Sequence, residues 1–178
     1  MFGRGAKAVA EQCHITEDKA KDIIAEFFKK YPVAARWIQH IVLVAQQQGG
    51  LRNFFGRKRR LVGLQSPDEE IQALSKRQAK NFLMQSGAAD LTNWLSVRLS
   101  QVLKPYDTRL VLNVHDSLVY EVPKEHLNTV VSLIQAEADR PIQGFYVPMA
   151  VELQVGKSWG DLKSPEKYQE DLEDENEI

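Results

Sequence analysis

Apolar residues recur at the three- and four-residue spacing of amphipathic helices over much of the chain. Thr16 and the carboxylates after it are typical of a helix N-terminus, and Gly49-Gly50 is typical of a helix end. A break or a close packing point is expected at Ser86-Gly87, inside the longest of these segments. The predicted helices cover residues 17–31, 33–48, 68–104 and 124–139.

Short runs rich in Val, Leu and aromatic residues predict two β-hairpins and one further strand. The hairpins join residues 51–55 to 58–62 and residues 108–114 to 118–122, and the last strand covers 147–155. Helices, hairpin, long helix, hairpin, helix and strand follow one another. This order favours an α+β fold, with helices packed on a small antiparallel β-sheet, over alternating parallel βαβ units.

The charged residues are unevenly distributed along the chain, and this distribution indicates the kind of partner to expect. With 178 residues, 43% hydrophobic and 26% charged, the chain is a folded domain, which excludes a mainly disordered or fibrous protein. Residues 161–178 carry eight acidic side chains against two lysines, whereas residues 1–160 carry 21 basic against 16 acidic. Ten basic residues lie between Arg52 and Lys104. We therefore expect a polyanionic partner for the body and a solvated, disordered acidic tail at 161–178.

The sequence also bears on compartment. Cys13 is the only cysteine, which excludes an intrachain disulfide and a thiolate metal cluster. No apolar run approaches the roughly 20 residues that span a bilayer, and the N-terminus lacks a signal-peptide core. We expect a cytoplasmic protein with no membrane partner.

Asp116 is the sharpest candidate for chemistry, because the tip of a hairpin can hold a carboxylate rigidly. Carboxylates held in this way bind Mg²⁺, which shares its oxygen shell with substrate phosphates. His, Asp and Ser are also common turn residues. Taken alone, His115-Asp116-Ser117 is therefore more often an ordinary turn than a metal site.

Basic and amide side chains form two further candidate sites. Five cations lie within the nine residues from Arg52 to Arg60. Arg77, Asn81 and Gln85 are four residues apart, so on a helix they lie along one stripe. Guanidinium and carboxamide groups in a row suit phosphates, sugars and base edges, although a solvated polar face would have the same pattern.

Read together, six motifs in order resemble the C-terminal part of a family A DNA polymerase, the group that includes bacterial DNA polymerase I and many phage replicative enzymes. The similarity covers residues 1 to about 160. Its motifs are Phe2-Gly3, Phe27-Phe28-x-x-Tyr31-Pro32 with Trp37-Ile38, Gly56-Arg57-Lys58-Arg59-Arg60, Arg77-x-x-x-Asn81-x-x-x-Gln85 with Ala88-Ala89-Asp90, Val114-His115-Asp116, and Gly156-x-x-Trp159. Phe2-Gly3 is similar to the Tyr-Gly that ends the nucleotide-binding finger helix, and Val114-His115-Asp116 to motif C of the palm.

The resemblance implies a division into partial fingers at 1–50, a palm portion at 51–160 and an acidic, flexible tail at 161–178. It implies that Asp116 and His115 are catalytic, that Asp116 binds the Mg²⁺ ions and that His115 contacts the primer terminus. The other implied nucleic-acid contacts are Arg57, Lys58, Arg59, Arg77, Asn81 and Gln85. Phe2 and Gly3 would lie near the nucleotide site.

Two local departures from the family pattern concern the palm. Ser117 stands where the family usually has Glu after the motif C Asp, so one outer carboxylate is missing, with weakened or unchanged catalysis expected. Ser86-Gly87 replaces the usual Gly followed by Thr or Ser, a swap that we expect to be tolerated.

The larger departure is that the motif A Asp and the finger Arg and Lys that grip the triphosphate fall upstream of the Phe2-Gly3 position. We therefore expect a DNA-directed DNA polymerase that uses primer-template DNA and deoxynucleoside triphosphates, with a two-Mg²⁺ site shared with an N-terminal partner chain, as in a split phage enzyme. Such a chain would be inactive alone. Two alternatives stay open: a non-catalytic duplex-binding module derived from a truncated polymerase, and a piece of an ordinary polymerase.

Overall fold

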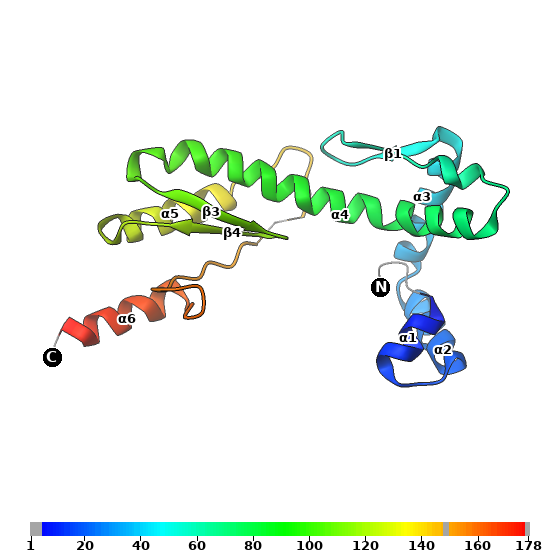
Figure 1. The fold of residues 1–178 in the computed structure, drawn as a ribbon, viewed down its shortest axis with the longest axis horizontal. Helices are drawn as coiled ribbons and strands as arrows, with labels where there is room; N and C mark the ends of the chain where they lie inside the picture. Colours follow the sequence, from blue (N-terminus) through cyan, green and yellow to red (C-terminus); the bar gives the residue numbers. More distant parts are fainter. Residues whose placement is uncertain (1–4, 148–149, 177–178) are drawn as a thin grey trace. The chain divides into compact units, whose positions relative to one another are not determined.

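The computed structural model describes residues 5–147 and 150–176, and these residues form two compact units that divide between Asp90 and Leu91. Most of the described residues are helical, and the strands form two small antiparallel two-stranded sheets (Figure 1). The α+β prediction is confirmed. The longest helix, α4 (Glu69–Val102), begins in the first unit and ends in the second.

The first unit is built from three helices, a short hairpin and the start of α4. Thr16 accepts a hydrogen bond from the Lys19 amide and caps the second helix, and Gly49 ends the third with a left-handed φ of 66°. Its elements before α4 are α1 (Ala6–Cys13), α2 (Glu17–Lys30), α3 (Pro32–Gln48), β1 (Gly50–Arg52), β2 (Lys58–Arg60) and the 3₁₀ turn η1 (Val62–Gln65).

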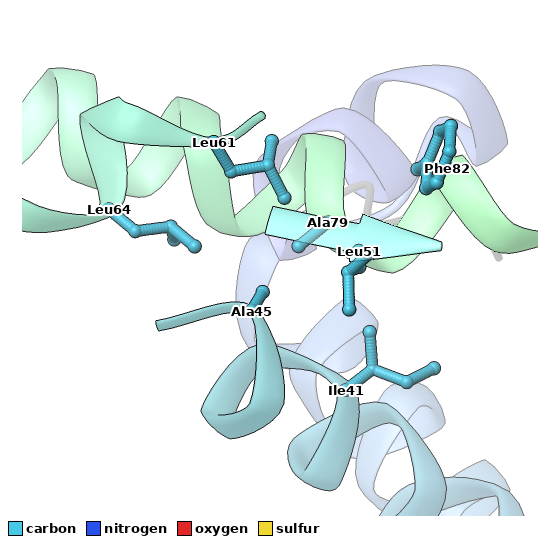
Figure 2. Close-up of a cluster of buried hydrophobic side chains, with 7 residues drawn as sticks. All are labelled: Ile41, Ala45, Leu51, Leu61, Leu64, Ala79 and Phe82. Atoms are coloured by element: carbon cyan, nitrogen blue, oxygen red, sulfur yellow. The ribbon is translucent and has the colours of Figure 1, made fainter. Parts of the chain in front are cut away.

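A buried apolar cluster packs the β1–β2 hairpin against α3 and α4 (Figure 2). Leu51 points from β1 toward Ile41 of α3, and Ala79 and Phe82 come from α4. The cluster also includes Ala45, Leu61 and Leu64. A Cβ on Gly50 would lie 2.2 Å from the Arg59 carbonyl oxygen, so glycine is needed where the two strands meet. The apolar packing thus sets the position of a hairpin whose second strand is wholly basic.

The second unit places a hairpin and a helix on the C-terminal part of α4. Leu99, Leu103 and Val130 form its buried core, with Leu118 and Tyr120 packed against them. Its further elements are η2 (Lys104–Tyr106), β3 (Arg109–Val114), β4 (Ser117–Glu121), η3 (Lys124–His126), α5 (Leu127–Ala138) and α6 (Pro165–Asn176).

Two predictions about helices were wrong. α4 continues through Ser86-Gly87, and a Cβ on Gly87 would meet nothing within 4 Å, so this glycine is neither a break nor a packing point. The acidic tail was expected to be disordered, but residues 165–176 form α6. Lys163 and Lys167 pair with Asp171 at 2.8 and 3.1 Å and offset part of its acidic charge.

The strand predicted over 147–155 is also absent from the described part of that segment. Val155 alone makes an isolated bridge there, to Lys163, through two backbone hydrogen bonds of 2.8 and 2.9 Å. The apolar pattern indicates an extended backbone, but a strand also needs a neighbour to pair with. Among the described residues β3 and β4 pair with each other, and this segment has no such neighbour beyond Lys163.

No helix within the described ranges is both long enough and apolar enough to cross a bilayer.

A buried carboxylate stabilises the second unit. Glu137 of α5 is only 4% exposed, accepts a hydrogen bond of 2.8 Å from Arg98 Nε of α4, and lies 3.1 Å from Arg140 Nη2. Because Glu137→Ala leaves the half-buried Arg98 without this partner, we expect the free energy of unfolding to fall by about 3 kcal/mol. Thermal or urea unfolding measures it, with the exposed Glu125→Ala as the matched control. Equal stability of the two variants would contradict this role.

Candidate metal and nucleic-acid sites

The β3–β4 hairpin holds Asp116 at its tip. Val114 pairs with Ser117, so His115 and Asp116 form a two-residue turn, and the Ser117 hydroxyl donates a 2.9 Å hydrogen bond to the Val114 carbonyl. His115 has a φ of 57°, a left-handed conformation that side-chain-bearing residues seldom adopt. Both His115 and Asp116 are exposed. The turn therefore presents an imidazole and a carboxylate to solvent from a support fixed by strand pairing.

The donor set at this tip suits one ligand of a magnesium site. Mg²⁺ in phosphoryl-transfer sites is held by one or two carboxylates, with waters and substrate phosphates completing its octahedron. Asp116 supplies one carboxylate, and the described ranges hold no group of three or more His, Cys, Asp and Glu that could bind a metal on its own. Ser117 bonds back to the turn. The described residues therefore fit at most one protein ligand of such a site at this tip.

The first unit holds the basic and amide candidates. Lys58, Arg59 and Arg60 make up β2 and are all exposed, and Arg52 opposite them donates a 3.1 Å hydrogen bond to the Gly56 carbonyl. Arg77, Asn81 and Gln85 lie on the uninterrupted α4, with Arg77 and Gln85 exposed and Asn81 half-buried. Because the helix is continuous, their spacing keeps them along one stripe.

A polar network that sequence reasoning missed ties the hairpin turn to α4. Asn53 Nδ2 donates to Asp90 Oδ2 at 2.7 Å and to Ser86 Oγ at 3.0 Å. Arg57 Nε donates to the two carboxylate oxygens of Asp90 at 2.9 and 3.0 Å, and Arg57 Nη2 adds another bond to Oδ1. The Asn53 side-chain oxygen accepts from the Arg57 amide at 2.9 Å. The turn is thereby anchored beside Ser86, the residue that follows Gln85.

The sequence signals for this network were the motifs that contain Arg57 and Asp90, and the acidic character of Asp90 in a stretch with ten basic residues. Asp90 is 9% exposed, and hydrogen bonds from the Arg57 guanidinium and the Asn53 amide hold the pKa of its carboxyl below the usual range. The bonds that hold the folded hairpin therefore favour the ionised form of Asp90.

Acid should loosen this anchor. Since the pKa of Asp90 is lower in the folded than in the unfolded chain, its ionic contribution is present above the unfolded pKa and is lost as the pH falls through the folded one. We expect the stability advantage of the wild type over Asp90→Asn to be largest near neutrality and to shrink below about pH 4. Urea unfolding at a series of pH values measures it, and an advantage that does not change with pH would contradict this.

The predicted site residues thus fall into two sets. His115 and Asp116 belong to the second unit, and the basic and amide residues belong to the first. Phe2 and Gly3, predicted to lie near the nucleotide site, are outside the described residues.

Comparison with solved structures identifies the class of this fold. The chain is similar to the POL domain of Pol1 from M. smegmatis, solved in complex with DNA primer-template and dNTP, with a TM-score of 0.82 and 26% identity. The alignment covers 89% of this chain and 28% of that one. The fold is therefore that of a portion of a polymerase domain.

The family follows from the sequence match. Residues 1–161 match DNA polymerase family A, and the chain belongs to this family. It is 30% identical to the thermostable DNA polymerase I of Thermus aquaticus over 166 residues, which are 92% of this chain and 20% of that protein. It is 26% identical to DNA polymerase theta of Drosophila melanogaster, with 92% of this chain and 8% of that protein covered. The chain spans at most about a fifth of the length of these curated relatives.

Proposed function

We propose that this chain is the C-terminal portion of the polymerase domain of a DNA-directed DNA polymerase. The whole polymerase adds deoxynucleotides to a primer 3′-end opposite a template. The observation that supports this best is the exposed Asp116 carboxylate on a rigid hairpin, in a chain of family A. In this proposal residues 1–50 belong to the fingers and 51–160 to the palm.

Asp116 is the residue of this chain that would hold Mg²⁺, which when bound lowers the pKa of the primer 3′-hydroxyl and neutralises charge on the transferred phosphate. His115, exposed beside it, contacts the primer terminus. Lys58 and Arg59 bind the nucleic-acid backbone. The stripe of Arg77, Asn81 and Gln85 follows the duplex through its minor groove.

The proposed activity requires an N-terminal polymerase portion. Two-metal transfer needs at least two convergent carboxylates, and within the described ranges no group of three or more His, Cys, Asp and Glu includes Asp116 in a metal site. The missing carboxylate belongs to motif A, and the finger residues that grip the triphosphate belong to the same portion. The catalytic site is therefore shared, and this chain is inactive alone.

The surface of β3 supports the same conclusion. Leu110, Val111 and Leu112 are 44, 54 and 40% exposed, although they stand in the strand that leads to Asp116. An apolar strand left in this state invites aggregation. We therefore propose that the N-terminal polymerase portion covers β3.

Co-purification tests this assembly. The tagged chain, expressed from its own genome, should bring down a larger polymerase fragment that mass spectrometry identifies by its motif A peptide. A chain that is monomeric in the native lysate, with no such fragment attached or fused to it, would contradict the shared site. It would leave the non-catalytic duplex-binding module as the function.

A further inference from the structure

The Arg57 side chain lies in the basic turn and is 57% exposed, yet its guanidinium is bonded to the protein. Its Nε and Nη2 groups donate to the Asp90 carboxylate, which is nearly buried on α4. A guanidinium that makes bidentate hydrogen bonds has a fixed orientation, and the carboxylate that it contacts neutralises its charge. The next cations, Lys58 and Arg59, are exposed and make no ion pair with any acidic side chain in the described ranges. Arg57 is thus paired with an acid, whereas the three cations of β2 that follow it, Lys58, Arg59 and Arg60, are exposed.

The anchor matters because the hairpin is short. β1 and β2 share only three residue pairs, Gly50 with Arg60, Leu51 with Arg59 and Arg52 with Lys58. Leu51 of the middle pair packs into the core, and the turn is held to α4 by Asn53 and Arg57. Without these polar bonds the exposed cations would lose a defined direction.

We infer that Arg57, together with Asp90 and Asn53, is a positioning residue that directs Lys58 and Arg59 at the nucleic-acid backbone, rather than a phosphate ligand itself. This inference rests on the proposed duplex binding. It also gives a role to an acidic residue in a basic part of the chain, because Arg57 neutralises the nearly buried Asp90 carboxylate.

The direction in which Asp90→Asn changes the affinity for duplex DNA tests the inference. Asp90→Asn removes a negative charge and frees Arg57, so if Arg57 were a phosphate ligand, or if charge alone mattered, affinity for a primer-template duplex would rise or stay the same. A positioning role predicts the opposite, a loss of about tenfold, the cost of one charge-assisted contact. Fluorescence anisotropy with the full chain measures it. The matched control is Glu69→Gln, which removes one charge from the exposed start of the same helix and should bind as well as the wild type or slightly better.

Hydrogen exchange gives a readout that does not depend on DNA. Asp90→Asn should speed exchange at amides of the hairpin, such as that of Asn53, which donates to the Arg57 carbonyl at 3.0 Å, and Glu69→Gln should not. Binding at or above the wild-type level, with exchange unchanged, would overturn the inference. If the wild type itself fails to bind duplex, the proposed function fails, and the exchange data still decide whether Asp90 anchors the turn.

A second variant covers the case in which Asp90→Asn does not fold. Arg57→Lys keeps the charge but cannot make the two-pronged bond. As a phosphate ligand, lysine would preserve most of the affinity and the salt dependence. As an anchor it would fail, so we expect a loss similar to that of Asp90→Asn. Wild-type affinity in Arg57→Lys would contradict the positioning role.

Discussion

Asp116→Ala should abolish primer extension by the assembled polymerase, lowering the single-turnover rate at least about a thousandfold, because a catalytic metal contributes several kcal/mol to the transition state. Affinity for the primer-template duplex should change little, since the basic and amide residues proposed to bind it lie in the other unit. Rapid-quench extension and anisotropy measure the two effects on the same preparation.

The control for this result comes from the same hairpin. Glu121 is exposed and pairs with Arg109 at the end of the hairpin opposite to Asp116. Glu121→Ala should therefore extend primers at nearly the wild-type rate. A rate for Asp116→Ala within a few-fold of that control would remove Asp116 from the catalytic site. Parallel loss of rate and duplex affinity in Asp116→Ala would indicate a folding defect instead of a lost metal ligand.

Val111→Lys should disrupt assembly with the N-terminal polymerase portion, weakening their association about a hundredfold, because a lysine would be desolvated in the apolar contact. Val111 is 54% exposed and stands at the register shift between Leu110 and Leu112, where it has no partner residue on β4. The substitution therefore leaves the hairpin pairing intact. Analytical ultracentrifugation or calorimetry of the two purified portions measures the change.

Leu43→Lys is the matched control for assembly. Leu43 lies on α3 in the first unit and is 55% exposed, so its substitution introduces the same charge at a similar exposure on an element other than β3. We expect it to associate like the wild type. If Val111→Lys also associates normally, the exposed face of β3 is not where the N-terminal portion docks.

The elements that local sequence determines could be predicted. The Thr16 cap, the Gly49 helix end and the polar tip between two apolar runs each act within a few residues, and the structure has them where expected. α6 was missed, although Ser164-Pro165-Glu166 is itself a typical helix start. The prediction of disorder there relied on the acidic composition of the segment instead of on this helix-start signal.

Features that depend on distant partners could not be predicted. Whether residues 147–155 form a strand depends on a neighbour that can pair with them, and no periodicity in the segment contains that information. The role of Asp90 likewise arises only when the turn at Asn53 folds onto α4 across more than thirty residues of sequence. The Asp116 tip was predicted from its own hairpin, but the residues that would complete a metal site with it cannot be found from that hairpin, and the described residues hold no such cluster.

Primer extension with Mg²⁺ and all four deoxynucleotides is the most direct measurement, comparing this chain alone, the N-terminal polymerase portion alone and the two together. The shared-site account predicts extension in the mixture only, and its loss when the mixture contains Asp116→Ala. Extension by this chain alone would contradict the need for a second carboxylate. No extension by a mixture whose components are folded and bound to each other would contradict the polymerase function and favour a duplex-binding module.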